Sequence, residues 1–285
     1  MQPFAYARPS TLSEALELLQ NHGARARVLA GGTDLIVELR NRSIKADLVV
    51  DLKGVEELQP RITDSDGTVT ITALTSMTEL HDHGLMRERF PALVDAAATV
   101  GSIQIRNRAT LAGNVCHASP AADTAPALLV YDAVAHISSA SARRQVGLRE
   151  FFVGPRRTVL EPDEVVTSIT LPPAAEGRAA TFARITRRRG VDLATVSLCC
   201  MVSEGGRTTF AYGAVGPRPF AVQDDTGVLA DPNASDADKD GVLRELAGRA
   251  TPISDVRGSR DYRAAMLMVL SRRALRSSIA RLRAA

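Results

Sequence analysis

Two short glycine-bearing segments carry the residue types that could bind a phosphate-bearing ligand in this chain of 285 residues. The first is Ala30-Gly31-Gly32-Thr33-Asp34-Leu35, and the second is Thr110-Leu111-Ala112-Gly113-Asn114. Glycines allow backbone N–H groups to approach an anion closely, and Thr33 and Asn114 add a hydroxyl and an amide. Downstream, Asp123 could accept a hydrogen bond from a ribose or ribityl hydroxyl. Taken alone, each segment is more typical of an ordinary turn or loop.

Other motifs of nucleotide and metal chemistry are missing from the sequence. The first segment has neither the G-x-G-x-x-G spacing of a dinucleotide fold nor the Gly-Lys-Ser/Thr ending of a P-loop. The three cysteines include no Cys-x-x-Cys pair and are too few for an ordinary iron–sulfur cluster. Cys199 and Cys200 are neighbours in an apolar run, so we expect inert thiols on opposite faces of a strand. His81 and His83 could chelate a metal, but two solvent-facing histidines are the simpler interpretation.

Short alternating strands and helices must position the first segment. Thr11 and Glu14 have capping-box spacing ahead of an apolar stripe that ends near Gly23, which predicts a helix. A strand is expected at 27–30, a helix at 35–40 whose start Thr33 and Asp34 can cap, and a buried strand at 47–52. The first segment therefore connects a strand to a helix.

The rest of the chain has a different pattern of expected helices and strands. Residues 68–73 alternate in polarity with period two, which is typical of a half-exposed strand. The segment 101–126, which contains the second glycine segment, is expected to be irregular. The arginine-bearing face of a long final helix, Arg263 included, is expected to be solvated, with a partner surface as the alternative. Helices are predicted at 78–83, 91–100, 125–131 and 262–282, strands at 133–138, 165–171, 181–186, 194–203 and 208–215, a linker at Pro172-Pro173 to Gly177, and a polar surface stretch at 223–240.

Composition narrows the class of protein. The net charge is only +3, and aromatic residues make up 4% with no tryptophan, so nucleic-acid binding is not expected. No stretch of about 18 uncharged apolar residues occurs, so no membrane-spanning helix is expected. The opening residues lack the basic and apolar regions of a secretory signal, which favours the cytoplasm. At roughly 150 residues per domain, the chain has room for two or three domains.

Taken with their surroundings, the two glycine segments resemble the FAD-binding medium subunit of the molybdenum hydroxylases, the family of xanthine dehydrogenase and carbon monoxide dehydrogenase. The resemblance runs nearly from end to end. Its further motifs are Phe4-x-Tyr6-x-Arg8-Pro9, Arg106-Asn107, Ser119-Pro120, Phe182-x-Arg184-Ile185, Asp192-Leu193-Ala194, Tyr212 to Pro219, and Ser259 with Tyr262-Arg263.

The resemblance implies an α+β fold of the vanillyl-alcohol-oxidase (PCMH) type, in which two N-terminal subdomains hold FAD between them. A small α/β subdomain is then expected at residues 1–58, and a second FAD-binding subdomain at 59–175. A C-terminal flavoprotein domain of three strands and a helical bundle is expected at 176–285.

The resemblance also implies roles for particular residues. Residues 30–35 would cradle the pyrophosphate of FAD, and residues 110–114 would hold the phosphates and the ribityl chain. Asp123 would form a hydrogen bond to the cofactor, and Val166 would be a further cofactor contact. Arg184 falls about where many members carry a lysine near the flavin ring. No residue of this chain is expected to be catalytic in its own right or to bind a metal.

The implied activity is electron transfer by an oxidoreductase subunit. A molybdopterin-binding large subunit would oxidise the organic substrate, and a small [2Fe-2S] subunit would pass electrons to the FAD held here. Reduced flavin would then deliver them to NAD⁺, O₂ or another acceptor, within an (αβγ)₂ assembly. This chain's own part would be to bind, orient and tune the flavin.

One departure from the family pattern concerns flavin affinity. Members usually have two adjacent glycines where this chain has Ala112-Gly113. A methyl group at 112 is tolerated if φ is negative there, whereas a positive φ would weaken FAD binding. Two alternatives remain. One is a free-standing flavoprotein oxidoreductase, for which His117 beside Cys116 is the candidate for a covalent flavin link. The other is a scaffold that has lost FAD through Ala112.

Overall fold

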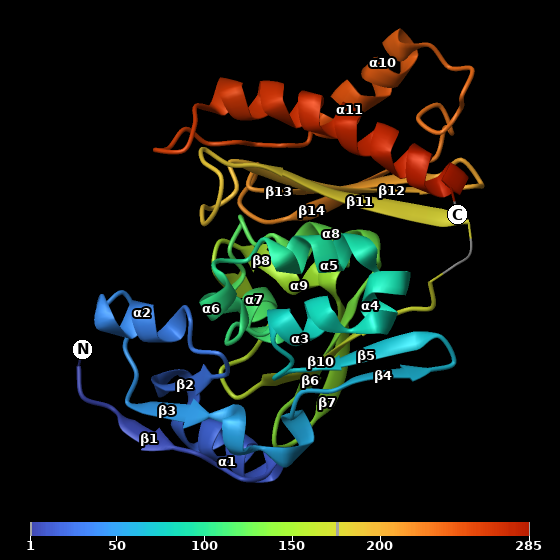
Figure 1. The fold of residues 1–285 in the computed structure, drawn as a ribbon. Helices are drawn as coiled ribbons and strands as arrows, with labels where there is room; N and C mark the ends of the chain where they lie inside the picture. The colour runs from blue at the N-terminus through green and yellow to red at the C-terminus, as the bar shows by residue number, and fades with distance from the viewer. Residues whose placement is uncertain (1, 175–176, 285) are drawn as a thin grey trace.

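A small parallel sheet begins the fold, at the lower left of Figure 1. The computed structural model describes residues 2–174 and 177–284. The strand order is β1-β3-β2, and the first helix packs against β2 and β3. As predicted, Thr11 caps this helix by accepting the Glu14 N–H, and Gly23 follows its last residue. The elements are β1 (Ala5–Ala7), α1 (Leu12–His22), η1 (Gly23–Arg25), β2 (Ala26–Leu29), α2 (Leu35–Arg40), β3 (Leu48–Asp51), η2 (Leu52–Gly54) and η3 (Glu56–Leu58).

A five-stranded antiparallel sheet and a group of short helices form the middle of the molecule. The strand order is β4-β5-β10-β6-β7, and each neighbouring pair runs antiparallel. The strands are β4 (Ile62–Ser65), β5 (Thr68–Thr72), β6 (Val134–Ser138), β7 (Arg143–Gly147) and β10 (Val165–Leu171), with a hairpin of β8 (Phe152–Gly154) and β9 (Arg157–Thr158). The helices are α3 (Met77–Asp82), α4 (Gly84–Arg89), α5 (Pro91–Ala98), α6 (Ile103–Arg106), α7 (Leu111–His117), α8 (Thr124–Val130) and α9 (Leu148–Phe151).

The expectation of an irregular segment at 101–126 is wrong in its details. Two short helices, α6 and α7, lie within it, and α7 contains most of the second glycine segment. Ser102 and Thr110 cap them by accepting the N–H groups of Ile105 and Gly113. Ser and Thr are residue types preferred at an N-cap. Neither Ser102 nor Thr110 has a Glu or Gln three residues later, so the sequence signal was weaker than at Thr11, which has Glu14.

The C-terminal part has four strands where three were expected. The additional strand, β14, pairs antiparallel with β13 and follows a proline-rich turn at 217–219 that obscured its pattern. The expected helical bundle consists of α10 and α11. The centre of the predicted linker, with the predicted domain boundary at 175/176, lies outside the described residues. The elements are β11 (Arg178–Ile185), β12 (Val196–Ser203), β13 (Thr208–Gly213), β14 (Phe220–Asp224), α10 (Asp236–Ala247) and α11 (Arg260–Ala284).

The C-terminal sheet is covered by helices on both faces, as Figure 1 shows. Helix α11 packs on β11 and β12 from above, and α5 and α8 pack on β11, β12 and β13 from below. The expected opposition of Cys199 and Cys200 is confirmed, because Cys199 belongs to the main core and Cys200 to the core under α11. Burial raises the pKa of Cys200 to about 12, so this thiol stays protonated and inert.

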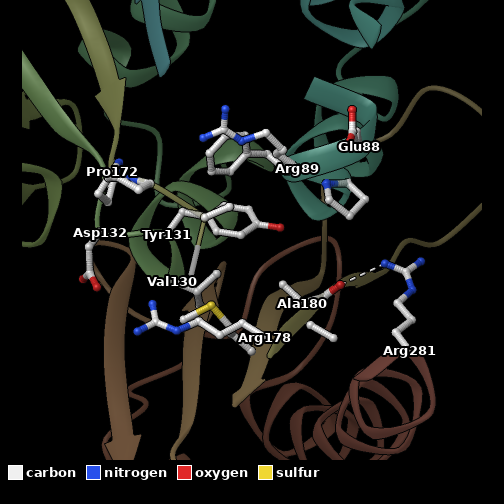
Figure 2. Close-up of a pocket in the computed structure, with 15 residues that line it drawn as sticks. Glu88, Arg89, Val130, Tyr131, Asp132, Pro172, Arg178, Ala180 and Arg281 are labelled. Atoms are coloured by element: carbon white, nitrogen blue, oxygen red, sulfur yellow. Dashed lines mark hydrogen bonds between the residues drawn. The ribbon is translucent and has the colours of Figure 1, made fainter. Parts of the chain in front are cut away.

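A cavity of about 320 Å³ lies where the C-terminal sheet meets the middle of the molecule (Figure 2). Arg89, Tyr131, Arg178 and Arg281 line it, and Arg281 donates to the Ala180 carbonyl at 2.9 Å. None of its lining residues belongs to either glycine segment, so this cavity is separate from the site described below.

Among the described helices, none has the length and apolar character that crossing a membrane requires.

Candidate functional site

The two glycine segments meet through direct backbone contact. A methyl group added at Gly31 would overlap the carbonyl oxygen of Arg108 and would lie 3.0 Å from the Cα of Ala109. These two residues immediately precede Thr110, so the first segment rests on the start of the second. Only glycine permits this approach, which explains the residue at position 31 by packing rather than by turn geometry.

The first segment presents backbone donors beside this contact. Gly32 has φ +78°, a conformation that favours glycine, and its neighbours lead into α2. Asp34 occupies the N-cap position of α2, but the expectation that its side chain caps the helix is wrong, because its own backbone is helical. In the described chain, the N–H groups of Thr33, Asp34 and Leu35 donate to no other protein group. An anion placed here would therefore find unsatisfied donors.

The second segment forms the first turns of α7. Thr110 Oγ1 accepts the Gly113 N–H at 3.0 Å, and a Cβ at position 113 would approach that oxygen to 2.8 Å. Ala112 lies within the helix and is not among the residues with positive φ, so the condition for tolerating its methyl group is met. Asn114 Oδ1 accepts from Thr124 Oγ1 at 2.6 Å, which orients the Asn114 amide.

Asp123 and Arg184 form a buried ion pair between the middle of the molecule and the C-terminal sheet. Arg184 Nη1 lies 2.8 Å from Asp123 Oδ2, at the N-terminus of α8. Burial raises the pKa of Asp123 to about 6, although the Arg184 charge and hydrogen bond act in the opposite direction. The facing Thr99 hydroxyl donates to the Ala96 carbonyl, and Asp123 Oδ1 is buried without a partner among the described residues. A ligand hydroxyl would satisfy that oxygen.

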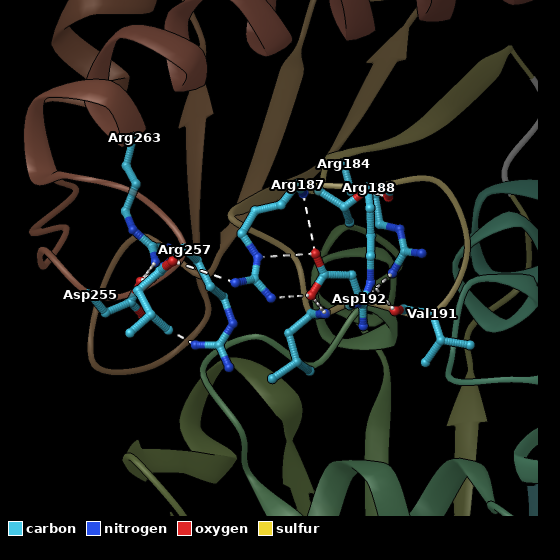
Figure 3. Close-up of polar contacts among 11 residues, drawn as sticks. Arg184, Arg187, Arg188, Val191, Asp192, Asp255, Arg257 and Arg263 are labelled. Carbon is cyan, nitrogen blue, oxygen red and sulfur yellow. Dashed lines mark hydrogen bonds and ion pairs between the residues drawn. The ribbon is translucent and has the colours of Figure 1, made fainter.

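A network of arginines and carboxylates anchors the loop that follows Arg184 (Figure 3). Arg187 and Asp192 form an ion pair at 2.9 Å, which lowers the pKa of Asp192 to about 2. Arg187 also donates to the Val256 carbonyl at 3.4 Å. The loop is therefore tied to the segment that leads into α11.

Arg263 completes this network, and its position corrects a prediction. The side chain is buried rather than solvated, and it donates to the carbonyls of Thr195 at 2.5 Å and Ala214 at 2.9 Å. It also pairs with Asp255 at 2.7 Å. Helical periodicity grouped Arg263 with the other arginines of α11. What distinguishes a buried arginine is its set of carbonyl acceptors, and here these are distant in the sequence.

Three residues that support the first segment were missed in the sequence. Lys53 Nζ donates to the Ala30 carbonyl at 3.3 Å and pairs with Asp51 Oδ1 at 2.7 Å. Tyr6 donates its hydroxyl proton to Asp51 Oδ2 at 2.6 Å. Although burial acts to raise the pKa of Asp51, hydrogen bonds from Lys53 and Tyr6 outweigh it and lower the pKa. The available signals were a carboxylate at the end of a buried strand and the place of Tyr6 in the first family motif, and neither indicated a contact with the first segment.

Replacing Lys53 by methionine should weaken flavin dinucleotide binding by about tenfold, the effect of losing one charge-assisted hydrogen bond. The Ala30 carbonyl would lose its donor, and the adjacent Gly31 backbone would gain freedom. Fluorescence titration of the apoprotein with FAD measures the dissociation constant. Lys45→Met, at an exposed lysine, is the matched control. Equal affinities for the two variants would contradict this role of Lys53.

Val166 is placed differently from the other predicted residues. Its side chain is 3% exposed and packs in the main core, on β10 where the register with β6 shifts. Any contact that it makes with a cofactor would therefore involve its backbone.

Among the described residues, no group of three or more His, Cys, Asp or Glu side chains could hold a metal ion.

Comparison with known proteins assigns the family. Residues 2–174 match the family model described as the FAD binding domain in molybdopterin dehydrogenase, and residues 181–278 match the CO dehydrogenase flavoprotein C-terminal domain. The chain is 32% identical to the glyceraldehyde dehydrogenase medium chain of Sulfolobus acidocaldarius, covering 96% of this chain and 97% of that one. It is 29% identical to the putative xanthine dehydrogenase FAD-binding subunit of Escherichia coli K12, covering 97% and 96%.

Solved structures agree with these matches. Carbon monoxide dehydrogenase from Hydrogenophaga pseudoflava superposes with a TM-score of 0.90 at 29% identity and covers 99% of both chains. Quinoline 2-oxidoreductase from Pseudomonas putida 86 gives a TM-score of 0.88 at 27% identity. The α+β fold of this FAD-binding type is thereby confirmed. The chain belongs to the FAD-binding flavoprotein subunits of the molybdenum hydroxylase family, which are oxidoreductases, and its cofactor is FAD.

Proposed function

We propose that residues 30–35 and 110–114 together hold the pyrophosphate and ribityl chain of FAD. The contact between Gly31 and Arg108-Ala109 carries this proposal, because it brings unsatisfied N–H groups of the first segment beside the capped helix of the second. Asp123 Oδ1 fits a ribityl hydroxyl, since it is a buried acceptor without a protein partner in the described chain. We also propose that Arg184 lies near the flavin ring, and its ion pair with Asp123, which we assign to the same site, supports this.

The reaction we propose is electron transfer within a larger assembly. FAD supplies the redox chemistry, and this chain's residues bind it, orient it and set its electrostatic surroundings. The proposed electron donor is a small [2Fe-2S] subunit, which receives electrons from a molybdopterin-binding large subunit. The proposed acceptor is NAD⁺, O₂ or another oxidant. We assign the assembly (αβγ)₂ stoichiometry and a cytoplasmic location, with which three free cysteines are compatible.

Exposed apolar side chains support a partner surface around the proposed site. Val37 lies on α2, directly after the first segment, and Ile103 and Ile105 lie on α6, directly before the second. Val191 and Leu193 are exposed on the loop that follows Arg184. Large exposed apolar side chains on elements next to the proposed site are typical of protein interfaces.

Anaerobic stopped-flow reduction tests the subunit assignment. The FAD-loaded chain alone should not be bleached by organic compounds named for its relatives, such as xanthine, glyceraldehyde or quinoline, because the proposed molybdenum site lies in another subunit. The complex isolated with its iron–sulfur and molybdenum subunits should be bleached by its substrate within one turnover. Fast bleaching of the isolated chain would instead identify a free-standing flavoprotein oxidoreductase.

A further inference from the structure

A single carboxylate on α2 connects this helix to two elements of the middle of the molecule. Glu38 Oε1 lies 3.0 Å from Arg156 Nη1, in the turn between β8 and β9. The same oxygen lies 3.3 Å from Nε2 of His117, the last residue of α7. The Glu38 side chain is 16% exposed, so solvent and salt screen these contacts only in part. Glu38 therefore joins the helix that follows the first glycine segment to the helix that contains most of the second.

Helix α2 does not belong to the main hydrophobic core. It contains six residues, of which only Leu39 is buried. Leu39 packs with Leu29 and Val49 of the small parallel sheet in a separate core. Figure 1 shows α2 above this sheet, on the side of the molecule where α6 and α7 lie. Apolar packing thus fixes α2 to the small sheet, and its hold on the middle of the molecule depends on polar contacts.

The two partners of Glu38 are fastened to each other. The Arg156 N–H donates at 2.9 Å to the carbonyl of Ala118, the residue that ends α7. Ala118 is fully buried in the main core. Ala118 has φ +48° and Arg156 has φ +55°, a conformation uncommon for residues other than glycine, so this turn has a defined shape. The middle of the molecule therefore presents a fixed docking point, and α2 is the part that moves when the contact is lost.

Glu38 also lies one turn beyond the donors that we assign to the pyrophosphate. Its N–H donates to the Asp34 carbonyl at 2.9 Å, so the backbone of residues 33–35 turns together with α2. The direction of these N–H groups relative to residues 110–114 therefore depends on where α2 is held. Donors that are already fixed in the binding geometry hold a ligand more tightly than donors that must be ordered first.

Resting on the FAD site proposed above, we propose that Glu38 is a positioning residue that latches α2 to the middle of the molecule and so controls how long FAD is retained. Its carboxylate acts through α2 rather than on the cofactor itself. With the latch closed, the N–H groups of residues 33–35 and the second glycine segment hold the pyrophosphate together. Without the latch, α2 moves with its own small core, and the pyrophosphate is released sooner.

The rate of FAD release tests this latch, measured at a single pH by the fluorescence gained when the loaded chain is diluted. Glu38→Met removes the carboxylate but keeps the length of the side chain and a good helix propensity. We expect release to be about tenfold faster, the effect of losing one charge-assisted hydrogen bond. Arg156→Met should accelerate release by only about threefold, because the Arg156 side chain is 61% exposed. Arg156→Lys keeps the charge and should restore a rate close to that of the wild type.

A double variant separates a latch from a general loss of stability. Glu38→Met combined with Arg156→Met should release FAD no faster than Glu38→Met alone, since both changes remove the same contact. Asp240→Met is the matched control, because it removes an ion pair with Arg272 that joins α10 to α11 above the C-terminal sheet (Figure 1). This control should release FAD at the wild-type rate. Far-UV circular dichroism reports the fold of each variant, and the two Arg156 variants decide the matter if Glu38→Met does not fold.

Competition by ADP, which carries a pyrophosphate without a flavin, reports on that end of the site alone. Glu38→Met should weaken ADP binding by a factor similar to its effect on FAD, and the visible absorption bands of bound FAD should keep their positions. Wild-type release rates in Glu38→Met and Arg156→Met, or additive effects in the double variant, would overturn the latch and leave the FAD site intact. Faster FAD release with unchanged ADP affinity would also overturn it. Absence of FAD binding by the wild type would instead refute the site itself.

Discussion

Replacing Gly31 by alanine is expected to leave the chain folded and to abolish its retention of FAD. The added methyl group would overlap the Arg108 carbonyl oxygen, which is backbone and cannot move aside as a flexible side chain can. The two glycine segments must then separate, so they can no longer hold one pyrophosphate together. We expect the dissociation constant for FAD to rise by at least about 100-fold, or roughly 2.7 kcal/mol.

Visible absorbance of the purified variant measures its FAD content, and far-UV circular dichroism reports its fold. Gly84→Ala is the matched control, because a methyl group at that position meets open space. Gly32→Val should also lose FAD, for the different reason that residue 32 has φ +78° and its Cβ would approach Leu29 Cδ1 to 2.8 Å. Wild-type FAD content in Gly31→Ala would show that the contact between the segments is not needed for binding.

Replacing Arg184 by methionine should destabilise the apoprotein strongly at alkaline pH and little at acidic pH. Asp123 is 7% exposed and would lose its only cation within hydrogen-bonding distance among the described residues. Breaking such a buried pair costs about 3 kcal/mol or more when the remaining group stays charged. At about pH 5 the Asp123 carboxyl is largely protonated, because burial raises its pKa to about 6, and little charge is then left unpaired.

The sign follows from proton linkage. A carboxyl group whose pKa is raised in the folded chain binds more protons folded than unfolded, so its contribution to stability falls as the pH rises through about 4 to 6. Without Arg184 that pKa rises further, and the loss extends to higher pH. Urea unfolding at about pH 5 and about pH 8 measures the difference. Arg184→Lys keeps the charge and should retain most of the stability, and Asp123→Asn should remove the pH dependence. A deficit that is equal at both pH values would contradict the ion pair as its cause.

Local signals predicted most of the fold because they involve neighbours in the chain. The cap at Thr11, the period-two strand at 68–72 and the apolar strand ending at Asp51 each depend on residues within one or two turns. Strand β14 was missed because a proline-rich turn precedes it. Pro217 and Pro219 interrupt the strand pattern just before β14, although β14 pairs with the strand that directly precedes it in the chain.

The candidate site was predictable in its backbone elements but not in its supporting side chains. Both glycine segments were identified from residue types, and their functional roles remain predictions. The support of Ala30 by Lys53 and the pairing of Asp123 with Arg184 join residues 23 and 61 positions apart. Asp123 was expected to form a hydrogen bond to the cofactor, and its ion pair with Arg184 through the other carboxylate oxygen was not foreseen. These residues become partners only when the chain folds, so the spacing of residues in the sequence could not predict their contacts.

Neighbouring thiols that belong to separate cores have a consequence for how this subunit can diverge. Cys199 and Cys200 lie on opposite faces of β12. One face of the C-terminal sheet therefore packs in the main hydrophobic core, and the other packs in the core under α11. A gene divided at Pro172-Pro173 would give two fragments that each expose an apolar surface, the kind of surface that drives aggregation. Transplanting the C-terminal sheet between relatives would therefore require matched substitutions on α5 and α8. Because the sheet belongs to both hydrophobic cores, the physical chemistry favours inheritance of this subunit as a single undivided gene.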